Sequence, residues 1–296
     1  MKKFSVNAVA WSDILITALA PVIWGSTYII TTQFLPPDRP FTAALIRVLP
    51  AGILLLLMTR RLPQFSEWPR LLILAALNIG FFQALLFVAA YRLPGGLAAV
   101  VGALQPLLMI VLVWVFDQRK PAIAVIFAAI TGVLGMAALL LGPGSVWDPV
   151  GIAAALSGTA CMAVGTYLSR RWNIALPVLA FTGWQLLLGG LILLPLACVF
   201  DPPLPVLMPV NIAGYAYLCV IGALLAYVLW FRGVARLPAV AISSLGLFSP
   251  LTAVLLGWIF LGQTIRGLSL AGLLMVLFSI LAVQWLSKPA APKKKG

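Results

Sequence analysis

The chain has 296 residues, of which 63% are hydrophobic and only 8% are charged, and its mean hydropathy is +1.14. This composition excludes a soluble globular domain and predicts a polytopic membrane protein. The net charge of +13 lies in short clusters between apolar runs, so it indicates membrane topology and no nucleic-acid partner. Three cysteines without paired spacing and the absence of histidine predict no disulfide framework, no metal site and no cofactor.

Apolar runs of membrane-spanning length follow one another along the whole chain. A spanning helix needs about 20 mostly apolar residues. Division at charges, prolines and polar clusters predicts ten such helices, at 14–34, 41–59, 71–91, 95–116, 122–141, 150–169, 177–199, 211–231, 239–261 and 267–286. The loops between them are too short for a soluble domain. The predicted fold class is an all-α integral membrane protein.

The basic residues predict the orientation of these helices, because cytoplasmic loops carry an excess of Lys and Arg. With both termini in the cytoplasm, 15 of the 19 basic residues fall on the inner side and three on the outer side. This asymmetry favours ten spans with N- and C-termini cytoplasmic.

An internal repeat divides the chain. Residues 92–116 placed over 236–260 without gaps share nine identities in 25 positions, where biased composition alone gives roughly two or three. Five helices therefore repeat once, with expected units at 1–143 and 144–296. Because five is odd, the second copy enters the membrane from the opposite side. Two inverted five-helix repeats suit alternating access.

Proline interrupts the fourth and ninth predicted helices at matching positions of the repeat. Gly102 and Pro106 in the first copy correspond to Gly246 and Pro250 in the second. Because a proline inside a helix removes one N–H and collides with the carbonyl four residues back, each is expected to free the carbonyl of its glycine. We predict that these pairs are hinges.

Polar and aromatic residues inside the spans are the candidates for a substrate route, because their burial in hydrocarbon is costly unless they have partners or line water. Either they line the route or they pack as structural glue between helices. The predicted substrate-binding set is Trp24, Tyr28, Asn78, Phe82, Gln83, Gln105, Trp184, Gln185, Tyr227, Ser244 and Ser249. Trp11, Trp68, Trp147 and Trp285 lie near helix ends and are expected to anchor the protein at the membrane interface.

Arg47 is the one permanently charged side chain that falls inside a predicted span, and Gln185 is its counterpart in the repeat. It either snorkels to the outer surface, caps carbonyls of a neighbouring helix, or contacts a substrate carboxylate. A structural role is slightly favoured because Gln185 is uncharged.

Acidic residues are expected only at helix ends or in loops, so a carboxylate or histidine proton relay has no evident carrier. A carrier of phosphorylated solutes would need paired Lys or Arg residues along its substrate route. Arg47 has no second basic residue in its span to form such a pair. The sequence also lacks the metal, phosphate-loop and Ser-His motifs of enzymes. A net-neutral solute, including a zwitterion, fits these absences best.

The chain resembles ten-helix EamA-type carriers of the drug/metabolite transporter superfamily over nearly its whole length. The resemblance rests on Trp24-Gly25-Ser26, Arg47, the Arg-Leu-Pro steps before helices 4 and 9, and the central Pro106 and Pro250. Gly262-Gln263 departs from the Gly-Glu that the family often carries after helix 9. Within the family, the chain is similar to bacterial aromatic amino-acid exporters of the YddG type. This resemblance implies a central cavity lined by helices 1–4 and 6–9.

The expected function is therefore that of a carrier in the bacterial inner membrane that exports amino acids, aromatic or neutral, by alternating access. Its expected partners are a small-molecule substrate and the lipid bilayer, and it is expected to be a monomer. Facilitated diffusion is predicted because no embedded titratable group is expected. The alternatives are an exporter of another small metabolite or drug on the same fold, and a channel; an enzyme is not expected.

Overall fold

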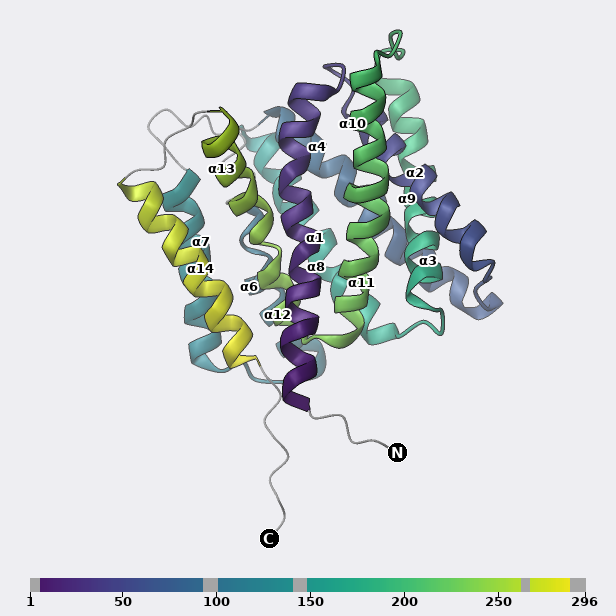
Figure 1. The fold of residues 1–296 in the computed structure, drawn as a ribbon. Helices are drawn as coiled ribbons and strands as arrows, with labels where there is room; N and C mark the ends of the chain where they lie inside the picture. Colours follow the sequence, from purple (N-terminus) through teal and green to yellow (C-terminus); the bar gives the residue numbers. More distant parts are fainter. Residues whose placement is uncertain (1–5, 93–100, 141–147, 262–266, 288–296) are drawn as a thin grey trace.

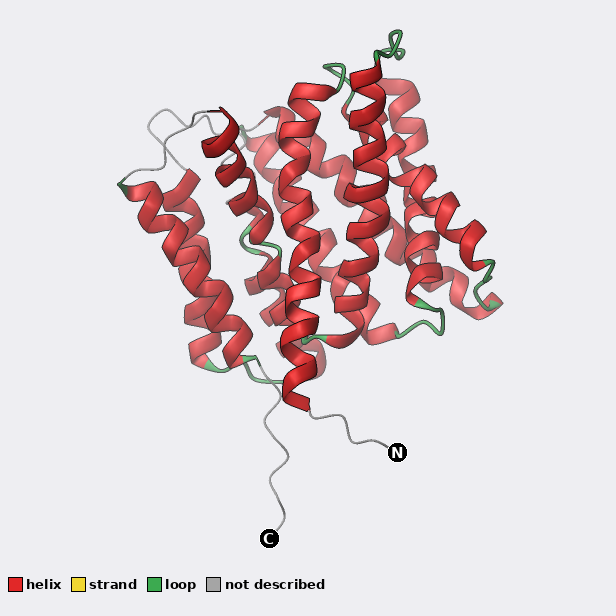
Figure 2. Ribbon diagram, viewed as in Figure 1, coloured by secondary structure: helices red, strands yellow, loops and turns green. Residues whose placement is uncertain are grey.

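The computed structural model describes residues 6–92, 101–140, 148–261 and 267–287. Within these ranges the regular elements are helices packed side by side (Figures 1 and 2). Nine of the described helices are long and apolar enough to cross a membrane, and Gln105–Asp117 is a shorter apolar helix. The described chain begins and ends at the same end of the bundle, the lower end in Figure 1. We call it the terminal end and the other the distal end.

The elements are numbered along the chain as in Figure 1. Up to Leu140 they are α1 (Val6–Phe34), α2 (Pro40–Thr59), η1 (Phe65–Glu67), α3 (Trp68–Ala75), η2 (Ala76–Phe81), α4 (Phe82–Arg92), α6 (Gln105–Asp117) and α7 (Ile123–Leu140). The later ones are α8 (Pro149–Trp172), α9 (Val178–Phe200), α10 (Pro209–Cys219), η3 (Val220–Leu225), α11 (Ala226–Arg236), α12 (Ala239–Leu245), α13 (Phe248–Leu261) and α14 (Leu268–Leu286).

Helix lies at each of the ten predicted spans. Several bounds follow from proline: α2, α8 and α10 each begin at a proline, whose fixed φ and missing N–H suit the first helical turn. One bound differs clearly, because α1 begins at Val6 and not near residue 14. The predicted start of the fourth span at residue 95 and the predicted boundary between units at 143/144 lie outside the described residues.

Close packing of two helix pairs flanks the centre: α2 lies against α9, and α7 against α14 (Figure 1). Glycine permits this approach in both pairs. A Cβ at Gly52 of α2 would stand 2.5 Å from the backbone nitrogen of Leu187 in α9. A Cβ at Gly272 of α14 would stand 2.5 Å from the carbonyl oxygen of Gly135 in α7. Small residues that let backbones meet are typical of membrane helix pairs.

Gly52→Ala is expected to destabilise the protein, because the added methyl group meets backbone that cannot rotate away. Overpacking of this kind costs about 1–3 kcal/mol. Gly102→Ala is the matched control, since no atom of the described residues lies within 4 Å of a Cβ added there. Melting of the purified variants in detergent should show a lower midpoint for Gly52→Ala alone; equal midpoints would contradict the packing at α2 and α9.

Two π-helical turns, η2 and η3, interrupt the third and eighth spans, each 144 residues from the other. This is also the offset between 92–116 and 236–260. The segment α3–η2–α4 runs from the terminal to the distal end, whereas α10–η3–α11 runs the opposite way (Figure 1). π-Helical turns are rare and often lie at functional sites.

The proline elements break their helices completely. The α12 helix ends at Leu245, two turn residues follow, and α13 begins at Phe248; Ala103 and Leu104 form the corresponding turn before α6. Pro106 and Pro250 therefore lie in the first turn of a new helix, where the missing N–H costs little. The expectation of a freed carbonyl at Gly246 is wrong, because that oxygen accepts a hydrogen bond from the Ser249 N–H at 3.1 Å.

Candidate functional site

Gln83 and Tyr227 meet at the centre of the bundle. Each is the second residue after a π-helical turn, Gln83 in α4 and Tyr227 in α11, and they are 144 residues apart. The Gln83 Nε2 group donates a hydrogen bond to the Tyr227 hydroxyl at 2.8 Å, and both side chains are buried. Two equivalent positions of the repeat therefore contact each other directly.

An aromatic cluster surrounds Tyr227. The ring of Trp24 in α1 lies 5.0 Å from that of Tyr227 and 5.3 Å from that of Trp230, measured between centroids. Both contacts are tilted, the arrangement that ring quadrupoles favour. Trp24 is partly exposed, whereas Tyr227 and Trp230 are buried. Phe82 packs against the same core. This cluster places aromatic rings beside polar groups.

The carbonyl oxygen of Gly222 in η3 joins this cluster to Arg47. It accepts hydrogen bonds from Trp24 Nε1 and from a terminal nitrogen of Arg47, both at 3.1 Å. Arg47 is only 8% exposed, so it does not snorkel to the surface. Of the three roles considered for Arg47, the structure supports capping of a neighbouring helix's carbonyl.

A second polar centre lies around η2. Asn78 Nδ2 donates to Gln185 Oε1 at 2.7 Å and to Ser169 Oγ at 3.0 Å, and all three side chains are buried. Asn78 stands 144 residues before Gly222, and Gln185 is the counterpart of Arg47. The two centres thus use equivalent positions with different chemistry, a neutral amide pair in one and an arginine with a carbonyl in the other.

Several buried polar atoms in these groups have no hydrogen-bond partner within the described part of the protein. They include Asn78 Oδ1, Gln83 Oε1, Gln105 Nε2, Gln185 Nε2 and Trp230 Nε1. Buried polar groups are nearly always satisfied by protein or water, and each orphan costs about 1–3 kcal/mol. Donors and acceptors of this kind suit a polar solute or water inside the bundle.

The remaining predicted residues have different surroundings. Gln105 lies close to the ninth span: a Cβ added at Gly246 would stand 3.4 Å from the Gln105 Oε1 atom. Ser244 is fully buried and bonded to Gln284 Nε2 at 3.0 Å and to the Ala241 carbonyl at 2.8 Å, so its contacts are internal. The backbone oxygen of Ser249 faces Gly25 of α1. Tyr28 lies in α1, but its side chain is outside the described part of the structure.

Trp184 stands apart from the central cluster. Its ring packs edge-on against Trp68 at 4.9 Å, and its Nε1 donates to the Arg61 carbonyl at 3.0 Å. Both partners lie near the helix ends that face the terminal end. Trp184 therefore joins the group that includes the expected interface anchor Trp68.

Asp13 corrects the expectation that acids lie only at helix ends or in loops. Because α1 starts at Val6, Asp13 is two turns inside a helix, and it is buried. Its Oδ1 forms ion pairs with Arg232 at 2.6 Å and Arg236 at 3.1 Å on α11. These groups lie at the terminal end, away from the central pair, and they tie α1 to α11.

The central site also contains features that were not expected from sequence. The π-helical turns, the Gly222 carbonyl and Ser169 were not among the predicted features. The 144-residue offset could have indicated Gly222, because Asn78 had already been selected in the other copy. Backbone acceptors and π-helical turns leave no residue-type signal of their own.

Comparison with known proteins places the chain among membrane transporters. Residues 11–141 and 149–285 match the model of the EamA-like transporter family. Protein PecM of Dickeya dadantii (strain 3937) is 43% identical over 277 residues, 93% of each chain. The uncharacterized inner membrane transporter YedA of Escherichia coli (strain K12) is 29% identical, over 88% of this chain and 87% of that one. A solved crystal structure shares the fold with a TM-score of 0.78 at 18% identity, covering 94% of this chain and 99% of that one.

Proposed function

Because the chain belongs to the EamA-like transporter family, we propose that this multi-pass membrane transporter exports neutral amino acids, aromatic ones in particular, by alternating access. The similarity to YedA, an inner membrane transporter of Escherichia coli, supports the bacterial inner membrane as its location. The observation that carries the substrate class is the set of aromatic rings beside orphaned amide groups and Arg47 at the bundle centre.

An amino acid would use each part of this site. Its carboxylate would receive charge-assisted hydrogen bonds from Arg47, whose fork geometry suits that group. Its ammonium group would donate to amide oxygens such as Gln83 Oε1, which has no partner in the described residues. An aromatic side chain would lie on Trp24 and the rings behind it. The proposed lining is Trp24, Tyr28, Asn78, Phe82, Gln83, Gln105, Gln185, Tyr227 and Ser249, with Trp184 and Ser244 as structural supports.

Alternating access would follow from two inverted units that rock around the Gln83–Tyr227 contact. Ion pairs at the two ends support this. Arg236 pairs with the buried Asp13 at the terminal end, while its counterpart Arg92 pairs with Asp148 at 3.5 Å at the distal end, where both groups are partly exposed. The closer contacts at the terminal end favour a form closed on that side, which the basic loops predict to be cytoplasmic.

The breaks before α6 and α13 would let the fourth and ninth spans bend during this exchange, with Gly102/Pro106 and Gly246/Pro250 as hinges. Pro106→Ala and Pro250→Ala are expected to lower the maximal transport rate more than they change the half-saturation constant, because they alter bending and leave the central groups in place. Initial-rate uptake into vesicles over a concentration series measures both constants. Unchanged turnover in both variants would leave the prolines as structural helix starts.

Transport is proposed to be facilitated diffusion, since the central groups Gln83, Tyr227, Asn78 and Gln185 include no carboxylate or imidazole. Purified protein in liposomes, loaded with labelled phenylalanine, should release it at the same rate with and without a pH gradient. Strict dependence on the gradient would exclude the uncoupled mechanism, and absence of flux for every amino acid would exclude the substrate class. A drug or another metabolite that competes with phenylalanine would support the alternative solute, and flux that does not saturate would support a channel.

A further inference from the structure

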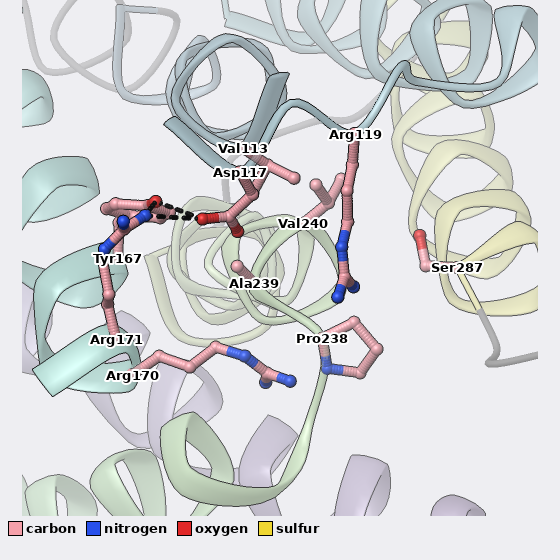
Figure 3. A pocket seen from close by; sticks show the side chains of 10 residues that line it. All are labelled: Val113, Asp117, Arg119, Tyr167, Arg170, Arg171, Pro238, Ala239, Val240 and Ser287. Carbon is pink, nitrogen blue, oxygen red and sulfur yellow. Dashed lines mark hydrogen bonds and ion pairs between the residues drawn. The ribbon is translucent and has the colours of Figure 1, made fainter. Parts of the chain in front are cut away.

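A cavity of about 250 Å³ opens at the terminal end, away from the central site. It lies between the end of α6, the end of α8, the loop before α12 and the end of α14. Its wall contains three arginines, Arg119, Arg170 and Arg171, against one acid, Asp117 (Figure 3). The proposed transport mechanism assigns no role to this basic cavity.

Asp117, the one acid among the described residues of the wall, is already neutralised. Asp117 Oδ1 forms an ion pair with Arg171 at 2.7 Å and accepts a hydrogen bond from the Tyr167 hydroxyl at 2.5 Å. Figure 3 shows these three side chains together on one side of the cavity. Arg171 and Asp117 cancel each other's charge, so the remaining wall carries the two positive charges of Arg119 and Arg170.

Arg119 and Arg170 approach the same open space from opposite sides, next to Pro238 (Figure 3). Among the described residues, neither guanidinium group has a hydrogen bond or an ion pair. Two like charges that converge without an intervening acid favour an anion between them, and paired guanidinium groups suit the oxygens of a phosphate group.

The position of the cavity along the membrane normal is also informative. Trp114, one turn before the end of α6, is 50% exposed, and Trp285, at the end of α14, is 69% exposed. Exposed tryptophans near helix ends mark the headgroup level of a bilayer. Pro238, Ala239, Val113 and Val240 give the same cavity an apolar wall. Basic pockets between membrane helices on the cytoplasmic side bind anionic headgroups.

We propose that this basic cavity binds a phosphate group through Arg119 and Arg170, carried either by an anionic phospholipid of the inner leaflet or by a free phosphorylated solute. The ligand would stand against Pro238, at the start of the broken ninth span. Binding there is independent of the solute that the central site carries.

The test compares two double variants that each remove two positive charges from the terminal end. Arg119→Gln/Arg170→Gln removes the pair in the cavity, and Arg61→Gln/Arg70→Gln removes two exposed arginines outside it. Full-length wild type and both variants are placed in nanodiscs of phosphatidylcholine, with or without phosphatidylglycerol. Native mass spectrometry then counts retained lipid, and melting is followed during titration with inorganic phosphate against chloride at equal ionic strength.

Wild type is expected to retain phosphatidylglycerol over phosphatidylcholine. The cavity variant should lose this preference by about tenfold or more, which corresponds to the loss of at least one charge-assisted contact. The Arg61/Arg70 variant should keep it. A response to phosphatidylglycerol alone supports a lipid, and a response to inorganic phosphate alone supports a free phosphorylated solute. Equal losses in both double variants, or a wild type that responds to neither phosphatidylglycerol nor inorganic phosphate, would overturn the proposal.

Discussion

Replacing Arg47 by alanine is expected to raise the half-saturation constant for amino-acid transport by about 10- to 100-fold, the equivalent of a lost charged hydrogen bond of about 1.5–3 kcal/mol. Arg47 is buried and donates to the Gly222 carbonyl, the same oxygen that holds Trp24 in the aromatic cluster. The substitution therefore removes the proposed carboxylate contact and one of the two side-chain donors to that oxygen. Initial-rate uptake in proteoliposomes measures the change.

Arg47→Lys tests how much of the expected change depends on the positive charge and how much on the shape of the guanidinium group. Lysine keeps the charge but lacks the planar fork of arginine, so its half-saturation constant should lie between those of wild type and Arg47→Ala. Size-exclusion profiles and melting midpoints of both variants establish how much folded protein is assayed. If folded Arg47→Ala transports with the wild-type constant, Arg47 has only a structural role, and the substrate carboxylate binds elsewhere.

Asp13→Asn is expected to cost about 2–3 kcal/mol of stability, because it leaves two arginines of α11 without their buried partner. The value lies below that of a fully buried pair since Arg236 is 51% exposed and Arg232 26% exposed. The melting midpoint should fall by about 5 °C. Asp38→Asn makes the same chemical change at an exposed loop residue and serves as the control.

A second substitution tests whether the loss comes from the orphaned charges. Asp13→Asn combined with Arg232→Gln should recover part of the stability, because one of the two guanidinium groups left without its carboxylate is then also removed. If Asp13→Asn melts at the same temperature as Asp38→Asn, the ion pairs between α1 and α11 contribute little to stability, and the proposed closure of the terminal end loses its support.

The architecture could be predicted because composition, periodic basic loops and a repeat act over many residues. Ten apolar runs of spanning length allow few other folds, and the structure has a helix at each of these runs. The pairing of Arg47 with Gln185 across the repeat also proved useful, since both anchor polar centres at a π-helical turn. These signals depend on residue type and spacing, which a sequence contains directly.

The sequence-based predictions failed where a residue's role depends on three-dimensional contacts. Asp13 looked like a loop residue because the polar residues before it hide two further turns of α1, and Arg232 and Arg236 that offset its burial come from far along the chain. Trp184 looked central by its place in a span, yet its partners Trp68 and Arg61 lie near helix ends. The fully broken helices before α6 and α13 could not be distinguished from proline kinks, because both need the same residues.

Counterflow tests most directly whether a central amino-acid site alternates between the two sides. Liposomes that contain the protein are loaded with unlabelled phenylalanine and diluted into trace labelled phenylalanine. The proposed carrier predicts transient accumulation of label above its equilibrium level, and a smaller overshoot in a Tyr227→Phe variant, in which the oxygen that accepts from Gln83 is removed. Label that only equilibrates, at a rate that does not depend on internal phenylalanine, would contradict alternating access to an amino-acid site.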